Sequence, residues 1–273
     1  MDQILQDLST RALVTAIEDN MFAFWLASTQ AEVHDDPELL WWITDSPPAI
    51  FNLLLRAKLM PETVNATIEA MIERARARSV SLMWWTGPAT RPPTLGLALE
   101  THRFTHRNLS GMAMNLRGVY EDRPVPGLVI ERVSNEETLR QWCQVFALGF
   151  GMPSGAADGW LAAYAGMEFA AQSPLRHYLG LFNGVPVATS SLCLAAGVAG
   201  IYCVATLPHF RQQGIGAAMT LAPLREAQAQ GYQASILQAS EKGFNVYSQL
   251  GFHEYCKIGI YTWSSDRDGV KQE

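Results

Sequence analysis

The most informative string in the sequence joins an apolar stretch to an expected helix and carries two closely spaced glycines. It reads Val204-Ala205-Thr206-Leu207-Pro208-His209-Phe210-Arg211-Gln212-Gln213-Gly214-Ile215-Gly216-Ala217. A loop that enters a helix in this way directs several unpaired backbone N–H groups at one place, where the helix dipole adds partial positive charge. Gly214 and Gly216 allow close backbone approach, and Arg211 can add a charge-assisted contact. The pattern therefore predicts an anion site suited to phosphate.

Two common phosphate-binding motifs fit this string poorly. A nucleotide P-loop places a lysine and a hydroxyl residue after its last glycine, whereas Ala217 follows Gly216 here. A dinucleotide fingerprint needs GxGxxG and an acidic residue at the end of the next strand, whereas the next apolar stretch reads Ser235-Ile236-Leu237-Gln238. The spacing is RxxGxG instead.

A second block, from Gln238 to Phe252, contains the pattern Y-x-x-L-G-F, which starts at Tyr247. Together with the loop and its V-A-T-x-P lead-in, this block resembles the GCN5-related N-acetyltransferase (GNAT) family. In that family Q/R-x-x-G-x-G/A wraps the pyrophosphate of acetyl-coenzyme A. The resemblance covers about Leu128 to Trp263 and, in degenerate form, Leu39 to Leu116.

The resemblance implies an α/β fold with a mixed sheet (α+β), namely a GNAT-like acyl-CoA N-acyltransferase fold in two tandem units. It implies acetyl-CoA as cosubstrate and no metal. The strand ending at Val204 would diverge from the one ending near Ala239, and pantetheine would bind in that gap as an added strand does. Tyr247 would be the catalytic acid that protonates the leaving thiolate. The residues expected to bind the cofactor are Cys203, Val204, Ala205, Thr206, Arg211, Gln212, Gln213, Gly214, Ile215, Gly216, Ala217, Ser240 and Asn245.

The general base stays unassigned. Members of the family often carry a glutamate on the strand before the loop, but the stretch Val198 to Val204 has no carboxylate. Glu168 and His177 are candidates by elimination. Ser240 stands seven residues before Tyr247, where many relatives have asparagine.

Two functions from different classes follow. The first is transfer of an acetyl group from acetyl-CoA to a primary amine, on a small molecule or a peptide, by direct attack in a ternary complex. The second is a non-catalytic acyl-CoA sensor, which the missing carboxylate favours. Structural roles are the alternatives for single residues: Tyr247 as a packed aromatic and Cys203 as a buried strand residue.

Apolar spacing predicts the elements that position these residues. Helices are expected at Asp7–Gln30, Glu62–Arg78, Asn135–Phe150, Ala156–Ala170 and Gly216–Gln230. Strands are expected at Leu39–Thr44, Ile50–Lys58, Val80–Trp85, Leu128–Val133, His177–Phe182, Val185–Leu194, Val198–Thr206, Ala234–Ala239 and Tyr255–Trp263. Asn183-Gly184 predicts a two-residue hairpin.

The two halves of the chain repeat one another at a nearly constant offset. Leu55 and Val204 both end an apolar stretch, 204 − 55 = 149 residues apart, and Phe104 and Phe252 lie 252 − 104 = 148 apart. The first half runs directly from Pro61 into its helix and has no glycine-bearing loop. We therefore expect a degenerate GNAT-like domain without a CoA loop at 1–122, a catalytic domain at 127–265 and a polar tail at 266–273.

Composition limits the classes of partner. A net charge of −6 and a pI near 5.5 argue against nucleic acid, whose phosphates favour a basic face. No stretch has the length and apolarity of a membrane span, and the start MDQILQDLST is unlike a signal peptide. Four cysteines without paired spacing fit a reducing compartment. We expect a cytoplasmic protein, with its oligomeric state open.

Overall fold

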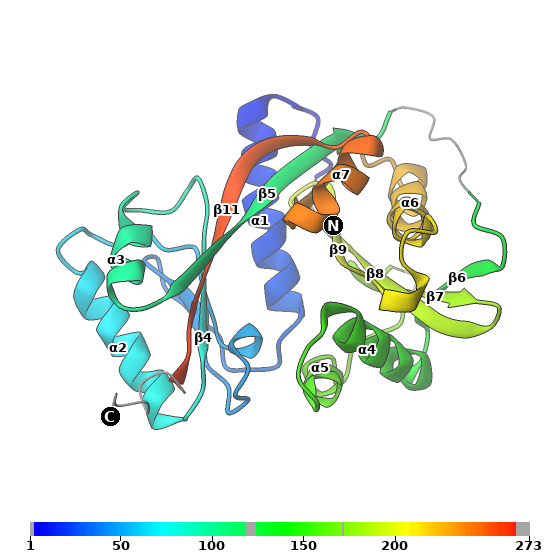
Figure 1. Cartoon of the computed structure of the whole chain (residues 1–273). Helices are drawn as coiled ribbons and strands as arrows, with labels where there is room; N and C mark the ends of the chain where they lie inside the picture. Colours follow the sequence, from blue (N-terminus) through cyan, green and yellow to red (C-terminus); the bar gives the residue numbers. More distant parts are fainter. Residues whose placement is uncertain (1–2, 118–123, 171, 266–273) are drawn as a thin grey trace. The chain divides into compact units, whose positions relative to one another are not determined.

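The chain divides into two units, each of which draws on segments that are far apart in the sequence. The computed structural model describes residues 3–117, 124–170 and 172–265 (Figure 1). Unit 1 consists of Met1–Ser28 and Gly111–Tyr255, and unit 2 of Thr29–Ser110 and Cys256–Glu273. The domains expected at 1–122 and 127–265 are contiguous, so the observed units differ from them at both ends of the chain. The expected polar tail lies outside the described residues.

Unit 1 is built on a mixed sheet with the strand order β5-β10-β9-β8-β7-β6. Strands β6 to β9 pair antiparallel in succession, and β10 pairs parallel with β9. Both residues of the Asn183-Gly184 turn have positive φ (50° and 81°), which confirms the predicted hairpin between β7 and β8. The strands are β5 (Thr105–Asn115, of which Gly111–Asn115 belongs to this unit), β6 (Leu128–Arg132), β7 (Leu175–Phe182), β8 (Val185–Ala195), β9 (Val198–Thr206) and β10 (Ala234–Ala239).

Helices cover both faces of this sheet. In Figure 1, α6 (Ile215–Ala229) lies on one side of strands β7 to β9, and α4 (Glu136–Phe150) and α5 (Ala156–Ala163) lie on the other. The α1 helix (Thr10–Ala27) packs beside α5, since the rings of Trp25 and Trp160 stack. A short α7 (Glu241–Gln249) follows β10. Within the described residues no helix is both long and apolar enough to cross a bilayer.

A single buried amide fastens α1 to the turn between β8 and β9. The Asn20 side chain donates to the carbonyl oxygens of Cys193, Ala195 and Val198 at 3.1, 2.8 and 3.3 Å. Its oxygen accepts a hydrogen bond from the Tyr202 hydroxyl at 2.8 Å. The first helix of the chain is therefore part of the unit that contains the C-terminal motifs.

The strands of unit 2 lie in the order β1-β2-β3-β4-β11-β5 in the sheet. The apolar core of the unit lies between this sheet and two helices and includes Ile68, Trp84, Leu99 and Trp263. The elements are β1 (His34–Asp35), β2 (Leu40–Trp42), a 3-10 turn (Ala49–Phe51), β3 (Leu53–Leu55), α2 (Val64–Ala77), β4 (Leu82–Thr86), α3 (Leu95–Thr101) and β11 (His253–Trp263). Strand β11 belongs to this unit from Cys256 onward.

The internal repeat is visible in the order of the elements. The run β3-α2-β4-α3-β5 has the same order as β9-α6-β10-α7-β11. Strands β5 and β11 are both 11 residues long, and their ends lie 253 − 105 = 148 and 263 − 115 = 148 residues apart. In unit 1, β10 is followed in the sheet by β5, and in unit 2, β4 is followed by β11. The last strand of each repeat therefore lies beside the second strand of the other repeat: β5 is next to β10, and β11 is next to β4.

Several elements differ from the sequence prediction. The expected helix Ala156–Ala170 ends at Ala163, and Gly166 beyond it has a φ of 76° that no helix accommodates. The expected strand Ile50–Lys58 shortens to Leu53–Leu55, because a 3-10 turn precedes it and Arg56 takes a positive φ of 52°.

We predict that Asn20→Ala lowers the free energy of unfolding by about 3 kcal/mol, because it leaves several buried polar groups without partners. Chemical denaturation of the full chain measures the effect. Thr15→Ala, at an exposed position of the same helix, is the matched control and should change the free energy by less than about 0.5 kcal/mol. Equal effects of the two substitutions would contradict the anchoring role of Asn20.

Candidate functional site

The site begins with one extra residue in β9. Thr189 of β8 pairs with Ala205, and Ser191 pairs with Tyr202, so two steps along β8 face three steps along β9. The bulge comprises Cys203 and Val204, and Cys203 has a positive φ of 52°. Such a bulge bends its strand and turns backbone groups out of the ladder. The bulge lies where the sequence placed the pantetheine contact.

Two buried hydroxyl side chains of β8 bond to Cys203, the residue with the positive φ. Thr189 Oγ1 donates to the carbonyl oxygen of Cys203 at 2.8 Å, and the Ser191 hydroxyl hydrogen-bonds the Cys203 thiol. Both hydroxyl residues are fully buried. A non-glycine residue in the left-handed region costs about 1–3 kcal/mol and persists only where its surroundings fix it. Thr189 and Ser191 supply that fixation.

A histidine extends this polar contact one strand further. His177 of β7 pairs with Ser191 in register, and its Nδ1 lies 2.7 Å from the Ser191 hydroxyl. Trp142 and Tyr164 enclose the imidazole, with ring centroids at 4.3 and 4.6 Å. Burial lowers the pKa of His177 to about 3 and raises that of Cys203 to about 12. Both groups are therefore neutral at pH 7.

Strands β9 and β10 stop pairing before the bulge. Their register pairs Ser235 with Ala199 and Ile236 with Gly200, whereas β9 continues to Thr206 and β10 to Ala239. Beyond Ile236 the two strands keep no ladder pairs with each other in the described structure. These unpaired edges are the place where the sequence analysis expected an extended ligand.

The loop after β9 forms a concave group of N–H donors. Gln212 and Gly214 have positive φ of 62° and 79°, and Gly214 is the N-cap of α6 without a side-chain cap. The first helical hydrogen bond runs from Ala218 N–H to Gly214. Within the described residues, the N–H groups from Gln212 to Ala217 have no protein acceptor. The first turn of α6 has no acidic residue, so the helix dipole there is not offset.

The space in front of these donors is open. A Cβ on Gly216 would meet only the Thr206 hydroxyl, at 3.9 Å, and one on Gly214 only a Val125 methyl, at 3.5 Å. Packing therefore does not require glycine at 216, whereas the positive φ does favour it at 214. A glycine that the fold does not need fits close approach by a ligand. We call the donors from Gln212 to Ala217 the N–H nest.

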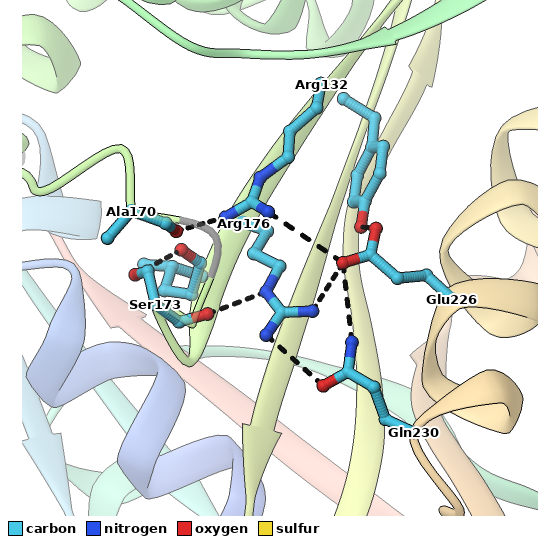
Figure 2. Close-up of polar contacts among 8 residues, drawn as sticks. Arg132, Ala170, Ser173, Arg176, Glu226 and Gln230 are labelled. Carbon is cyan, nitrogen blue, oxygen red and sulfur yellow. Dashed lines mark hydrogen bonds and ion pairs between the residues drawn. The ribbon is translucent and has the colours of Figure 1, made fainter.

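Helix α6, which begins at the N–H nest, is anchored by a charged cluster near its C-terminal end. Glu226 of α6 makes a close ion pair and hydrogen bond with Arg176, which is 3% exposed, and a close hydrogen bond with the Tyr178 hydroxyl (Figure 2). Arg132 lies 3.9 Å from the same carboxylate. Arg176 also donates to the carbonyl of Ser173 at 2.7 Å. These contacts fix α6 to β6 and β7 and thus fix the direction in which its N-terminus points.

Tyr247 lies on α7, the helix that follows β10. Its ring packs edge-on to Phe252, with centroids 6.1 Å apart, and against Gly243, where a Cβ would come within 2.9 Å of it. Burial raises the pKa of Tyr247 above its usual value, and the nearby Cys203 thiol adds to the rise. The phenol therefore keeps its proton at neutral pH and lies close enough to the bulge for Cys203 to influence it.

Ser240, Asn245 and Arg211 are the other expected site residues, and the structure shows their contacts with the protein. Ser240 is the N-cap of α7, where its hydroxyl accepts from Gly243 N–H at 3.3 Å, and Asn245 is exposed on that helix. The Arg211 guanidinium donates to the carbonyls of Thr206 and Gly149 at 3.0 and 2.8 Å. The sequence analysis missed the roles of Thr189 and Ser191, for which no local pattern exists.

The hydrogen bond that holds the bulge should contribute to the free energy of unfolding. We predict that Thr189→Val costs about 1–3 kcal/mol, because a buried carbonyl loses its donor. The cost should fall by about 0.5 kcal/mol or more when Cys203→Gly is present, since glycine adopts the left-handed backbone without strain. Denaturation of the two single variants and the double variant measures this coupling. Strictly additive effects would contradict it.

The C-terminal region matches a known family. Residues 139–252 match the family model described as "Acetyltransferase (GNAT) family". The match runs from α4 through the bulge and the N–H nest to Phe252, at the end of the second sequence block. No curated protein sequence matches the chain significantly.

Solved structures of low sequence identity share the fold. A GCN5-related N-acetyltransferase from Kribbella flavida is 18% identical with a TM-score of 0.68, covering 94% of this chain and 96% of its own. One from Sphaerobacter thermophilus is 15% identical with a TM-score of 0.61, covering 83% and 76%. A tandem GNAT protein from the clavulanic acid biosynthesis pathway is 14% identical with a TM-score of 0.56, covering 86% and 79%. The mixed α/β fold is that of GCN5-related N-acetyltransferases, and residues 139–252 form a GNAT acetyltransferase domain.

Proposed function

We propose that this protein transfers an acetyl group from acetyl-CoA to a primary amine by direct attack in a ternary complex. The observation that carries the proposal is the presence, within unit 1, of the N–H nest, the unpaired strand edges and a Tyr247 that keeps its proton at neutral pH. The nest suits a pyrophosphate, the open edges suit the two amides of pantetheine, and the phenol suits the sulfur at its end.

The reaction at this site needs two proton movements. The amine attacks the thioester carbonyl, and the negative charge passes to the CoA sulfur as the carbon–sulfur bond breaks. Tyr247 donates its proton to that sulfur. The proton of the attacking amine leaves by another route, because β9 carries no carboxylate. His177 is a poor acceptor, since burial lowers its pKa to about 3. We therefore propose that the amine attacks in its neutral form and loses its proton to water.

Unit 2 fits the role of a degenerate counterpart that has lost its cofactor site. Between β3 and α2, the N–H groups of Lys58 and Leu59 donate to the carbonyls of Glu38 and Arg91 at 2.7 and 3.0 Å. Donors that bond to the protein are not free for phosphate. We propose one CoA site per chain, in a tandem arrangement such as the clavulanic acid pathway protein has by its description.

A non-catalytic acyl-CoA sensor is the second candidate, and the lack of a carboxylate on β9 favours it. Free-thiol release from acetyl-CoA, measured over a panel of primary amines, separates the two. Amine-dependent release supports the enzyme. Tight CoA binding without release for any amine supports the sensor. The four cysteines are free, which fits our further proposal of a cytoplasmic location.

The nest predicts a defined loss of affinity. Gly216→Val places a branched side chain in front of the donors, and the loss of two or three charge-assisted bonds should raise the Kd for acetyl-CoA about a hundredfold. Calorimetric titration measures it. Ala229→Val, exposed on the same helix, tests the cost of a β-branched residue there and should bind normally. Unchanged affinity in a folded Gly216→Val protein would place the pyrophosphate elsewhere.

Tyr247→Phe tests the acid role, because it keeps the packed ring and removes the proton. We expect kcat to fall by ~10²-fold or more with little change in acetyl-CoA affinity. Since the pKa of Tyr247 is raised, the wild-type rate should not decline between about pH 7 and pH 9 through loss of this proton. Wild-type turnover in the Phe variant would reduce Tyr247 to a packing role.

A further inference from the structure

Arg211 lies in the cofactor loop, but its side chain bonds to another part of unit 1. Its Nε donates to the carbonyl of Thr206, the last residue of β9, at 3.0 Å. Its Nη2 donates to the carbonyl of Gly149, in the last turn of α4, at 2.8 Å. The guanidinium thus bridges the end of the strand that carries the bulge and the end of the helix before the α4–α5 connection.

The contact completes the C-terminus of α4. The last carbonyls of a helix have no partner within it, and here Gly151 and Met152 N–H satisfy Leu148 and Ala147 at 3.1 and 2.9 Å. Arg211 satisfies the next carbonyl, Gly149. A cation at this position is also favoured by the helix dipole. The last turn of α4 has no basic residue of its own.

Helix α4 ends against β9 without space for adjustment. A Cβ on Gly149 would lie 2.8 Å from the Ala205 Cβ. Beyond this contact the chain faces open space, since a Cβ on Gly151 or Gly155 would meet nothing within 4 Å. Both glycines have positive φ, 66° and 86°. The connection Gly151–Gly155 is therefore held at its start by the packing of Gly149 and by Arg211.

We propose that Arg211 is a positioning residue that couples occupation of the N–H nest to the order of the α4–α5 connection. This inference rests on the proposed function. A phosphate bound to Gln212–Ala217 fixes the loop in which Arg211 stands. With its backbone fixed, Arg211 holds the Gly149 carbonyl more firmly, and the Gly151–Gly155 segment becomes more ordered. Because coupling is reciprocal, an amine that orders this segment also tightens CoA binding.

The coupling differs from a direct phosphate contact in what it predicts. A guanidinium that binds phosphate should cost CoA affinity more than ~10-fold when removed. A guanidinium that bonds to Thr206 and Gly149 should leave the Kd for CoA within about threefold and should change the α4–α5 connection instead. Arg211→Met removes all donors at similar side-chain length. Arg211→Lys keeps the charge but replaces the planar fork by a single ammonium group.

Hydrogen exchange by mass spectrometry on the full chain, with and without coenzyme A, tests this. In the wild type, CoA should slow exchange in peptides that cover 147–156. In Arg211→Met, CoA should bind within about threefold of wild type but protect these peptides at least ~3-fold less, with Arg211→Lys between the two. Arg140→Met removes an arginine from the other end of α4, where it pairs with Glu136 and Glu137, and should behave as wild type.

Three results would overturn the inference. Equal protection of 147–156 in wild type and Arg211→Met removes the coupling and leaves the proposed function standing. Loss of CoA binding in a folded Arg211→Met protein makes Arg211 a phosphate ligand. A wild-type protein that binds no CoA removes the proposed function and the coupling together, and the titration shows this before any exchange is measured.

Discussion

The geometry of the candidate site depends on the one-residue bulge in β9. The extra residue at Cys203 changes the register against β8, and it follows Gly200, the last residue of β9 that pairs with β10. A flat, fully paired strand here would have its N–H and C=O groups saturated by its neighbours. The bulge is maintained by side chains of β8, so the open edge of β9 depends on the buried polar residues below it. The backbone of β9 along this unpaired edge is thus shaped by strain that the core stabilises.

Local patterns predicted the parts of the structure that local chemistry determines. Gly214, Gly216 and the Asn183-Gly184 hairpin follow from backbone preferences within a few residues. Thr189 and Ser191 carry no such signal, because their partner Cys203 joins them only after β8 and β9 pair. Strand β5 was missed because its first half is exposed and polar, and burial starts only near Ser110. The contacts of Arg211 with the carbonyls of Thr206 and Gly149 could not be predicted, because a sequence does not show which carbonyls a long side chain will reach.

The two repeats share the order of their elements but differ in how the N–H groups of their loops are bonded. Both have a strand, a loop, a helix and a second strand parallel to the first. In unit 2, Arg56 directly after the first strand has a positive φ, whereas in unit 1 the positive φ of Cys203 lies within the first strand. There the loop N–H groups are occupied by the carbonyls of Glu38 and Arg91. The difference between the repeats lies in which acceptors reach the loop donors, and the order of the elements stays the same.

The position of Asn20 has a consequence for how the chain is made. Its carbonyl partners follow it by 173 to 178 residues, so a ribosome releases α1 long before β8 and β9 exist. During that interval the apolar face of the helix, including Leu13, Ile17 and Phe24, has no native surface to cover it. Contacts of such sequence separation slow folding and expose apolar surface to other chains. The nascent protein should therefore depend on chaperones until most of unit 1 has been synthesised, although its first helix is complete almost at once.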